Sequence, residues 1–314
     1  MDKILIAGLD TLAGANIAAI LKDRFELTGL CFEHPLQLKG ADCQTCSPDD
    51  AAGITQLVRS LRPAWIIYCG QASIPSWHAD AECGNPALLT QRAKTWSTVA
   101  GQTQTPLTVL SSDGIFTGPW MFHDDDSEKF CESTTAKAIR TMEREVRSAC
   151  PQALIVRTQV FGWAPSEEIP SFAADTVEQL RANVEIPLDY LRHATPILAT
   201  DLAEILEQAY VRRLAGTYHI SGSERINPYR FSALLAEQFG LPCCISGTME
   251  PVSTRAQMFG AGESSLTCRR IKGELGISLP MMLESIQRFH AQSLTDFCDQ
   301  FAGGGRRSPR PMVA

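Results

Sequence analysis

An apolar segment near the start of the chain runs directly into a glycine-containing turn, and the turn runs into a helical pattern. Residues 3–7 (Lys-Ile-Leu-Ile-Ala) are typical of a buried strand, and residues 12–21 repeat small and apolar side chains at helical spacing. Gly8 and Gly14 lie in the turn between them. Such a unit brings backbone N–H groups and the positive end of a helix dipole to one point, where doubly wound α/β proteins bind phosphate.

The alternation of strands and helices continues to about residue 157. We expect strands at 27–32, 64–69, 107–111 and 153–157, and helices at 51–61, 86–100 and 134–149. The segment Ala-Trp-Ile-Ile-Tyr-Cys at 64–69 is apolar throughout, as in a central parallel strand that is covered on both faces. The pattern predicts an α/β protein with a Rossmann-type, doubly wound parallel sheet.

The pattern is less regular after residue 157, which indicates a smaller C-terminal α/β lobe beside the sheet. We expect helices at 172–181, 201–212, 228–239 and 281–301, and a short strand at 217–220 in this lobe. We therefore assign residues 1–160 to a dinucleotide-binding domain, to which later segments can return. Residues 161–302 form the substrate-binding lobe and C-terminal helix, and residues 303–314, rich in Gly, Arg and Pro, form a disordered tail.

Composition narrows the class of protein. The 314 residues are 44% hydrophobic and 20% charged, which is typical of a globular protein. A formal net charge of −7 argues against a general nucleic-acid binder, and no apolar run is long enough to span a membrane. Eleven cysteines without a signal peptide or a regular framework indicate a reducing cytoplasm. Cys43 and Cys46 have no second cysteine pair at zinc-site spacing, so we expect no metal.

The first turn supplies candidate cofactor contacts. Gly8 allows the tight turn, Gly14 allows close contact between helix and strand, and Leu12 opens the helix. Thr11 stands where the backbone would approach a phosphate; its side chain takes up room, although its hydroxyl is able to donate a hydrogen bond. Cys69 and Gly70 follow the central strand and are expected at the same edge of the sheet.

Glu33, after the second strand, has two interpretations. It either accepts hydrogen bonds from an adenosine ribose and repels a 2′-phosphate, which favours NAD over NADP, or it is a solvated loop carboxylate. The sequence leaves both interpretations open, since Lys39 or another cation beside Glu33 would offset its repulsion of a 2′-phosphate.

Six segments resemble one family. They are the first turn, 111–118 (Ser-Ser-Asp-Gly-Ile-Phe-Thr-Gly), 123–125, 156–162, 195–203 and 216–222 (Gly-Thr-Tyr-His-Ile-Ser-Gly). In this order they are similar to the extended short-chain dehydrogenases, specifically the sugar-nucleotide-binding family of dTDP-4-dehydrorhamnose reductase. The similarity runs from about residue 3 to residue 289. It implies a bound NAD or NADP and a nucleotide-sugar ligand, with Asp113 and Thr158 near the substrate.

The resemblance also implies a Ser/Thr–Tyr–Lys catalytic set. Ser112 matches the Ser/Thr, and Lys137 matches the lysine, which also contacts the cofactor ribose. Counting from the acidic run, Ser133 stands where the family has tyrosine. A serine hydroxyl is far less acidic than a phenol and its side chain is shorter, so it does not replace the tyrosine as proton donor.

Two later residues are candidates for other roles at the site. His193 has a suitable pKa to donate a proton in place of the tyrosine, or it is an ordinary loop histidine. Arg192 either pairs with a substrate phosphate or forms a surface salt bridge.

Three functions follow from these residues. We favour a catalytically inactive protein that binds NAD(P), a nucleotide sugar or both, with cofactor binding that is either weakened or lost, and that acts as a regulatory or scaffold subunit. The regulatory β subunit of methionine adenosyltransferase is a family member of this kind. The second is an active NAD(P)-dependent reductase with a relocated proton donor, and the third is an interaction module with a closed cleft. We expect a homodimer or a partner enzyme subunit.

Overall fold

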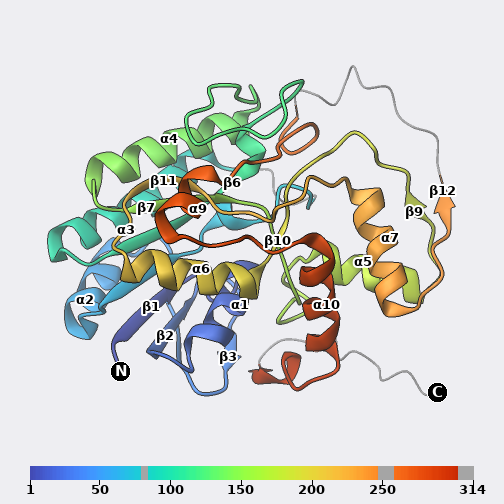
Figure 1. Ribbon diagram of the computed structural model, residues 1–314. Coiled ribbons are helices and arrows are strands. Elements are labelled where there is room, and N and C mark those ends of the chain that lie inside the picture. Colours follow the sequence, from blue (N-terminus) through green and yellow to red (C-terminus); the bar gives the residue numbers. More distant parts are fainter. Residues whose placement is uncertain (79–83, 247–257, 303–314) are drawn as a thin grey trace.

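The computed structural model describes residues 1–78, 84–246 and 258–302, and its centre is a seven-stranded parallel sheet (Figure 1). The strand order is β11-β7-β6-β5-β1-β2-β4. The strands are β1 Lys3–Ala7, β2 Glu26–Cys31, β4 Asp42–Thr45, β5 Trp65–Tyr68, β6 Leu107–Ser112, β7 Leu154–Thr158 and β11 Gly216–His219. The order reverses between β1 and β5, so the predicted doubly wound α/β fold is confirmed.

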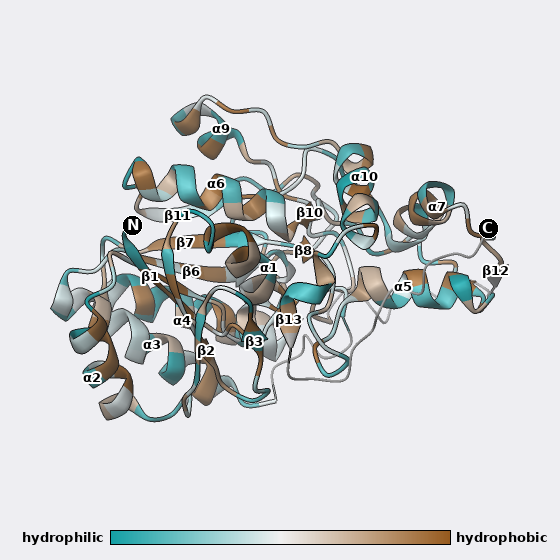
Figure 2. Ribbon diagram, turned by 90° about the horizontal axis from the view of Figure 1, so that it is seen from below, coloured by the Kyte–Doolittle hydropathy of each residue, from teal (hydrophilic) through white to brown (hydrophobic). Residues whose placement is uncertain are grey.

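Helices cover both faces of this sheet. One face carries α1 (Leu12–Leu21) and α6 (Ala199–Val211), which pack against each other. The other carries α2 (Ala51–Leu61), α3 (Pro86–Thr103) and α4 (Thr134–Ala149). Because successive strand side chains point to opposite faces, β1 divides between two cores: Ile4 and Ile6 belong to the first, and Leu5 and Ala7 to the second. Figure 2 shows the hydrophobic character of these central strands.

A smaller lobe lies beside one end of the sheet (Figure 1). It contains α5 (Phe172–Arg181), α7 (Pro228–Phe239) and α10 (Met282–Ser293), with α7 packed against the other two. Two short parallel pairs accompany them, β8 (Val160–Phe161) with β10 (Ile197–Leu198) and β9 (Ile186–Pro187) with β12 (Ile245–Ser246). Aromatic contacts consolidate the lobe, among them Phe161 against Phe231 and Phe289.

Two expectations for the C-terminal half are wrong. The strand expected in the smaller lobe at 217–220 is β11, which pairs with β7 as an edge strand of the main sheet. The helix expected at 281–301 ends at Ser293, because the apolar stripe breaks at the exposed Leu294. The chain then forms β13 (Phe301–Ala302), antiparallel to β3 (Gln37–Leu38), with Phe301 opposite Leu38.

The expected tail at 303–314 lies outside the described residues. Among the residues that the structure describes, no helix combines the length and apolar character that a membrane crossing requires.

Candidate functional site

A cleft of about 240 Å³ lies at the carboxyl ends of β1, β2 and β5. Parallel sheets bind ligands at this edge, next to the point where the strand order reverses. Five of the predicted cofactor residues line the cleft: Thr11, Leu12, Glu33, Cys69 and Gly70.

Two glycines, Gly8 and Gly14, shape the turn that carries the cleft residues Thr11 and Leu12. Gly8 has φ +94°, and a Cβ on it would lie 1.9 Å from the carbonyl oxygen of Cys69. A Cβ on Gly14 would lie 2.0 Å from the carbonyl oxygen of Gly8. The turn therefore requires glycine at both positions, which is what close packing of α1 on β1 and β5 demands.

Thr11 caps α1 from within the turn. Its Oγ1 donates to the Gly8 carbonyl oxygen at 2.8 Å and accepts from the Gly14 N–H at 3.0 Å. The hydroxyl proton is thus already used inside the turn. The expectation that this hydroxyl donates to a phosphate is not supported, because the only proton it has goes to Gly8.

Asp10 ties the turn to the end of β2. Its Oδ2 accepts the backbone N–H groups of Phe32, Glu33 and His34 at 2.9, 2.6 and 2.9 Å. Its Oδ1 is buried and has no hydrogen-bond partner among the residues that the structure describes. Sequence reasoning missed Asp10, although an acidic residue inside a phosphate-binding turn was a signal.

Glu33 is exposed at the rim, with 68% of its side chain accessible. Its Oε1 lies 4.0 Å from Nη1 of Arg92, a lining residue on α3 that the sequence analysis did not single out. Arg92 makes two 2.9 Å hydrogen bonds to Asp49. These bonds lower the pKa of Asp49, and they make Asp49, not Glu33, the nearer partner of the guanidinium.

Ser133 and Lys137 do not line the cleft. Ser133 is the N-cap of α4, where its Oγ accepts from the Ala136 N–H at 3.2 Å. The side chain of Lys137 is 57% exposed and its Nζ lies 3.0 Å from Oε2 of Glu132, so the ion pair lowers the pKa of Glu132. Lys137 faces a separate groove that also contains Arg140.

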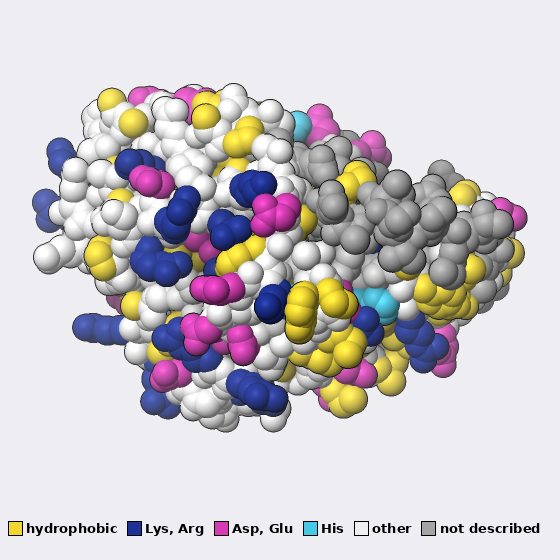
Figure 3. Space-filling model, turned by 90° about the horizontal axis from the view of Figure 1, so that it is seen from above, with side chains coloured by type: hydrophobic (Ala, Val, Ile, Leu, Met, Phe, Trp, Pro, Cys, Tyr) yellow, Lys and Arg dark blue, Asp and Glu magenta, His cyan; other side chains and the backbone are white. Residues whose placement is uncertain are grey.

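The inward face of α4 begins two residues after Ser133. Thr135 and Ile139, which have the Tyr-x-x-x-Lys spacing, are 4% and 1% exposed and point into the core. Neither supplies a phenol or an amine. Figure 3, which views the molecule from above, shows basic and acidic side chains intermixed on the outer surface.

Ser112 and Asp113 are buried at the end of β6. Oγ of Ser112 accepts from the Gly114 N–H at 3.1 Å, and Oγ of Ser264 donates to Oδ2 of Asp113 at 2.7 Å. Burial raises the pKa of Asp113 to about 7. Asp113 is therefore bonded within the protein and closed to solvent.

A covering segment, residues 258–266, packs over the end of β6. A Cβ on Gly114 would lie 2.7 Å from the ring of Phe259, and a Cβ on Gly260 would lie 2.2 Å from the Ser76 carbonyl oxygen. Ser76 in turn donates its N–H to Oε1 of Gln159 at 2.7 Å. Protein atoms of the covering segment thus pack directly against Gly114, two residues after Ser112.

His193 also contacts the covering segment. Its N–H donates to the carbonyl oxygen of Gly262 at 2.9 Å, and its Nδ1 lies 3.2 Å from the Leu191 carbonyl oxygen. Burial lowers the pKa of His193. It does not line the nucleotide-sized cleft, so the structure does not bring it to Thr11 or Cys69.

Neither Arg192 nor Thr158 lines the cleft beside Thr11. Nε of Arg192 bonds to Oδ2 of Asp189 at 2.6 Å, and its Nη1 donates to the Trp77 carbonyl oxygen at 3.0 Å. Arg192 lines a second cavity of about 230 Å³ in the smaller lobe. Thr158 is buried at the end of β7, and its hydroxyl has no hydrogen-bond partner within the described part of the chain.

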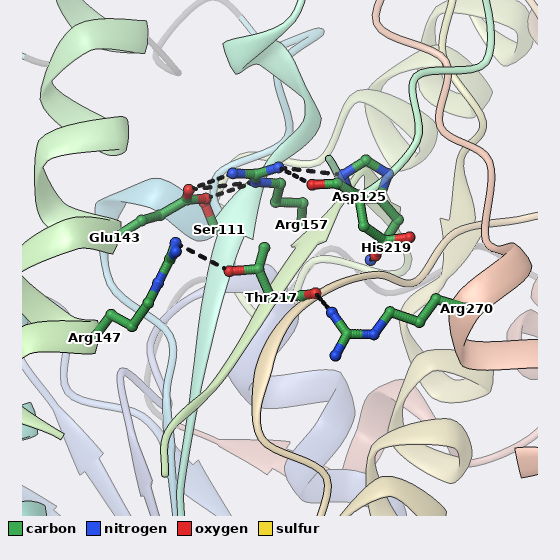
Figure 4. A network of polar contacts seen from close by, with 8 residues as sticks. All are labelled: Ser111, Asp125, Glu143, Arg147, Arg157, Thr217, His219 and Arg270. Atoms are coloured by element: carbon green, nitrogen blue, oxygen red, sulfur yellow. Dashed lines mark hydrogen bonds and ion pairs between the residues drawn. The ribbon is translucent and has the colours of Figure 1, made fainter. Parts of the chain in front are cut away.

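Four of the family-like segments meet in a buried polar network, through Ser111, Asp125, Arg157 and His219 (Figure 4). Arg157 bonds to both carboxylate oxygens of Glu143 on α4, and Glu143 accepts from Ser111 Oγ at 2.6 Å. His219 on β11 donates its N–H to Oδ1 of Asp125 at 2.7 Å. Burial lowers the pKa of His219 to about 3. These residues join α4, β6, β7 and β11, so their role is structural.

The residues that the structure describes contain no group of three or more His, Cys, Asp or Glu able to hold a metal ion.

Comparison with known families matches nearly the whole chain. The family model described as RmlD substrate binding domain covers residues 2–295. The chain belongs to this family.

Two curated relatives share sequence with this RmlD-family chain. Methionine adenosyltransferase 2 subunit beta of Xenopus tropicalis is 25% identical over 212 residues, and that of Xenopus laevis is 24% identical. Each match covers 65% of this chain and 62% of the relative, so the chain spans less than two thirds of the length of these relatives.

Solved structures share the fold. The dTDP-4-dehydrorhamnose reductase of Bacillus anthracis in complex with NADP has a TM-score of 0.77 at 16% identity, covering 93% of this chain and 99% of that one. The enzyme WbmH of Bordetella bronchiseptica, in complex with NAD⁺, has a TM-score of 0.73 at 15% identity, and the match covers 93% of this chain and 98% of that one. The UDP-glucose 4-epimerase of Thermotoga maritima, with UDP-glucose, has a TM-score of 0.73 at 13% identity, and the match covers 93% of this chain and 100% of that one.

Proposed function

We propose that this RmlD-family protein binds a nucleotide in the cleft beside Thr11 and does not catalyse hydride transfer. One observation carries the proposal: the inward positions of α4 are Thr135 and Ile139, not a tyrosine and a lysine. A reductase of this family needs the phenol to protonate the carbonyl oxygen and the amine to lower the phenol pKa. Lys137, the one lysine near these positions, is paired with Glu132 at the surface.

The covering segment supports the same proposal independently. Phe259 and Gly260 lie against Ser76 and Gly114, where a reductase would hold the reacting carbon atoms. His193, the alternative proton donor, bonds to Gly262 of the same segment. An active enzyme would have to displace this segment and still lack the phenol, so no contact of His193 favours the reductase alternative.

We further propose that the protein acts as a regulatory subunit of another enzyme. The support is the similarity to methionine adenosyltransferase 2 subunit beta, whose name describes a subunit. A protein of this kind uses ligand binding to stabilise one conformation at an interface. Gel filtration and affinity purification with the tagged full chain test for a homodimer or a partner enzyme.

The catalytic part of the proposal is tested with purified protein. NADH or NADPH is mixed with a 4-keto nucleotide sugar, and the loss of reduced nicotinamide is followed by absorbance. We expect no oxidation above the protein-free rate, and turnover at an ordinary enzymatic rate would overturn the proposal.

Nucleotide binding is tested separately by thermal unfolding. A ligand at 100 times its dissociation constant adds about 2.7 kcal/mol to stability. Lys137→Ala is expected to leave this shift unchanged, as is the matched control Lys94→Ala, which removes another exposed lysine paired with a glutamate. If Lys137→Ala loses ligand binding and Lys94→Ala does not, Lys137 contributes to the binding site and its placement outside the cleft is wrong.

A further inference from the structure

We propose that the ligand is a ribonucleoside mono- or diphosphate with an unsubstituted ribose, and that Asp10 Oδ1 accepts a hydrogen bond from a ribose hydroxyl. The inference rests on nucleotide binding as proposed above and names the ligand class. It also assigns a specificity-determining residue that lies in the glycine turn.

The first argument is the state of the Asp10 carboxylate. Asp10 lines the cleft and is 7% exposed. Its Oδ2 is held by three backbone N–H groups, which fixes the orientation of the carboxylate, while Oδ1 is buried without a donor. A carboxylate oxygen accepts hydrogen bonds strongly, and a buried acceptor without a donor is costly. A ligand hydroxyl supplies the missing donor.

The second argument concerns position. The three N–H groups on Oδ2 belong to residues 32–34, directly after β2. A nucleotide in this fold places its ribose hydroxyls at the end of the second strand, with its phosphate at the N-terminus of the first helix. Asp10 therefore lies between the expected phosphate and ribose positions.

Glu33 is the less suitable acceptor. Its side chain is 68% exposed and faces Arg92 at 4.0 Å, whereas the Asp10 carboxylate is fixed and desolvated. A hydrogen bond to a buried charged group contributes more to affinity than one at an exposed rim. The same buried carboxylate repels a 2′-phosphate, because no Lys or Arg among the described residues forms an ion pair with it.

The third argument limits the length of the ligand. The cleft encloses about 240 Å³, which is below the roughly 300–1,000 Å³ of typical small-molecule sites. Phe259 and Gly260 pack on Gly114 and Ser76 outside the lining of the cleft, and we infer that they take up the space that a second nucleoside would need. The residues present do not fit the nicotinamide half of NAD or NADP, whereas one nucleoside with its phosphates fits the open part.

The test uses calorimetric titration of the full chain. ADP, GDP, UDP and CDP are titrated first, and the tightest is compared with its 2′-deoxy, 3′-deoxy and 2′-phosphorylated analogues. We expect one deoxy analogue to bind roughly ten- to a hundredfold more weakly, as follows from the loss of a hydrogen bond to a charged group. The 2′-phosphorylated analogue should not bind measurably, and NAD⁺ should bind no tighter than the diphosphate.

A variant identifies the acceptor. Asp10→Asn should bind the parent diphosphate more weakly by a similar factor and should no longer discriminate against the deoxy analogue. Asp42→Asn, the same substitution on the exposed strand β4, is the matched control and should behave as the original protein. Glu33→Gln should keep the discrimination.

The outcomes separate the two proposals. Equal binding of diphosphate and both deoxy analogues by the unchanged protein overturns the Asp10 assignment even if Asp10→Asn does not fold. NAD⁺ binding more than tenfold tighter than the diphosphate overturns the length limit. Failure of every nucleotide to bind overturns this inference and nucleotide binding together, whereas oxidation of NADH overturns only the proposed lack of catalysis.

Discussion

Arg157 and Glu143 form an ion pair in the interior, with Nη2 of Arg157 2.7 Å from Oε2 of Glu143 and side chains 7% and 2% exposed. Arg157 belongs to β7 and Glu143 to α4, so the pair fixes the helix against the sheet. Ser111 and the carbonyl oxygen of Asp125 complete the hydrogen bonds around it (Figure 4).

Removing one partner of this pair leaves a buried charge without compensation. Arg157→Met should lower the free energy of unfolding by about 3–5 kcal/mol, measured by urea denaturation. Arg181→Met breaks an exposed pair with Glu178 and should cost less than about 1 kcal/mol. Replacing both Arg157 and Glu143 by apolar residues should cost less than Arg157→Met alone. Equal costs for Arg157→Met and Arg181→Met would contradict the buried-pair interpretation.

Asp113 gives the protein a pH-dependent stability. Its pKa is about 7 in the folded protein against 3.8 for the free side chain, because burial disfavours the charged form. The folded state therefore binds more protons than the unfolded state between these values, and this residue lowers stability as the pH rises from about 4 to 7. The slope approaches about 1.4 kcal/mol per pH unit.

Asp113→Asn should remove this dependence. The difference in unfolding free energy between the variant and the original protein should grow in favour of the variant as the pH rises from 5 to 8. Asp126→Asn, in an exposed loop, serves as the control and should leave the pH profile unchanged. His219 acts in the opposite direction, since its lowered pKa makes stability fall as the pH drops below about 6.5. This contribution is the same in the variant and in the original protein, so it cancels in the difference between their unfolding free energies.

Gly114 accommodates the ring of Phe259. Gly114→Ala should destabilise the protein by about 1–3 kcal/mol in thermal unfolding, because the new methyl group would lie 2.7 Å from that ring. Combining it with Phe259→Leu should recover part of the loss. Gly273→Ala in α9 (Arg269–Leu275), where no atom lies within 4 Å, should instead stabilise slightly. If Gly114→Ala and Gly273→Ala behave alike, the covering segment does not pack on Gly114.

Thr11 stabilises α1 through its hydroxyl. Thr11→Val keeps the shape but removes the acceptor for the Gly14 N–H, so it should cost about 1 kcal/mol in urea denaturation. Thr11→Ser keeps the hydroxyl and should cost much less. A Thr11→Val protein as stable as Thr11→Ser would show that the cap contributes nothing.

Periodicity was sufficient to predict most of the sheet, because buried parallel strands such as β5 are apolar throughout and are separated by helices. The edge strand β11 was assigned to the wrong unit. Four residues carry too little pattern to indicate which sheet they join, and pairing with β7 is a contact between segments far apart in the chain.

The candidate site was predicted less well than the fold. Counting from the acidic run aligned Ser133 and Lys137 with the catalytic positions, but the apolar spacing of Ile139, Met142 and Val146 marks a different face of α4 as buried. That spacing indicates that Thr135 and Ile139, rather than Ser133 and Lys137, correspond to the tyrosine and lysine of the family. Asp10 and Phe259 act through partners distant in sequence, which no local pattern reveals.

Because β11 pairs with β7, the main sheet is complete only after residues 216–219 have been synthesised. Residues 216–219 leave the ribosome after α5 and α6, yet they complete the main sheet beside β7. A chain cut after residue 160 would leave β7 with an open hydrogen-bonding edge, and such edges promote aggregation. Residues 1–160 are therefore not an independent folding unit, and expression of either half alone should yield insoluble protein.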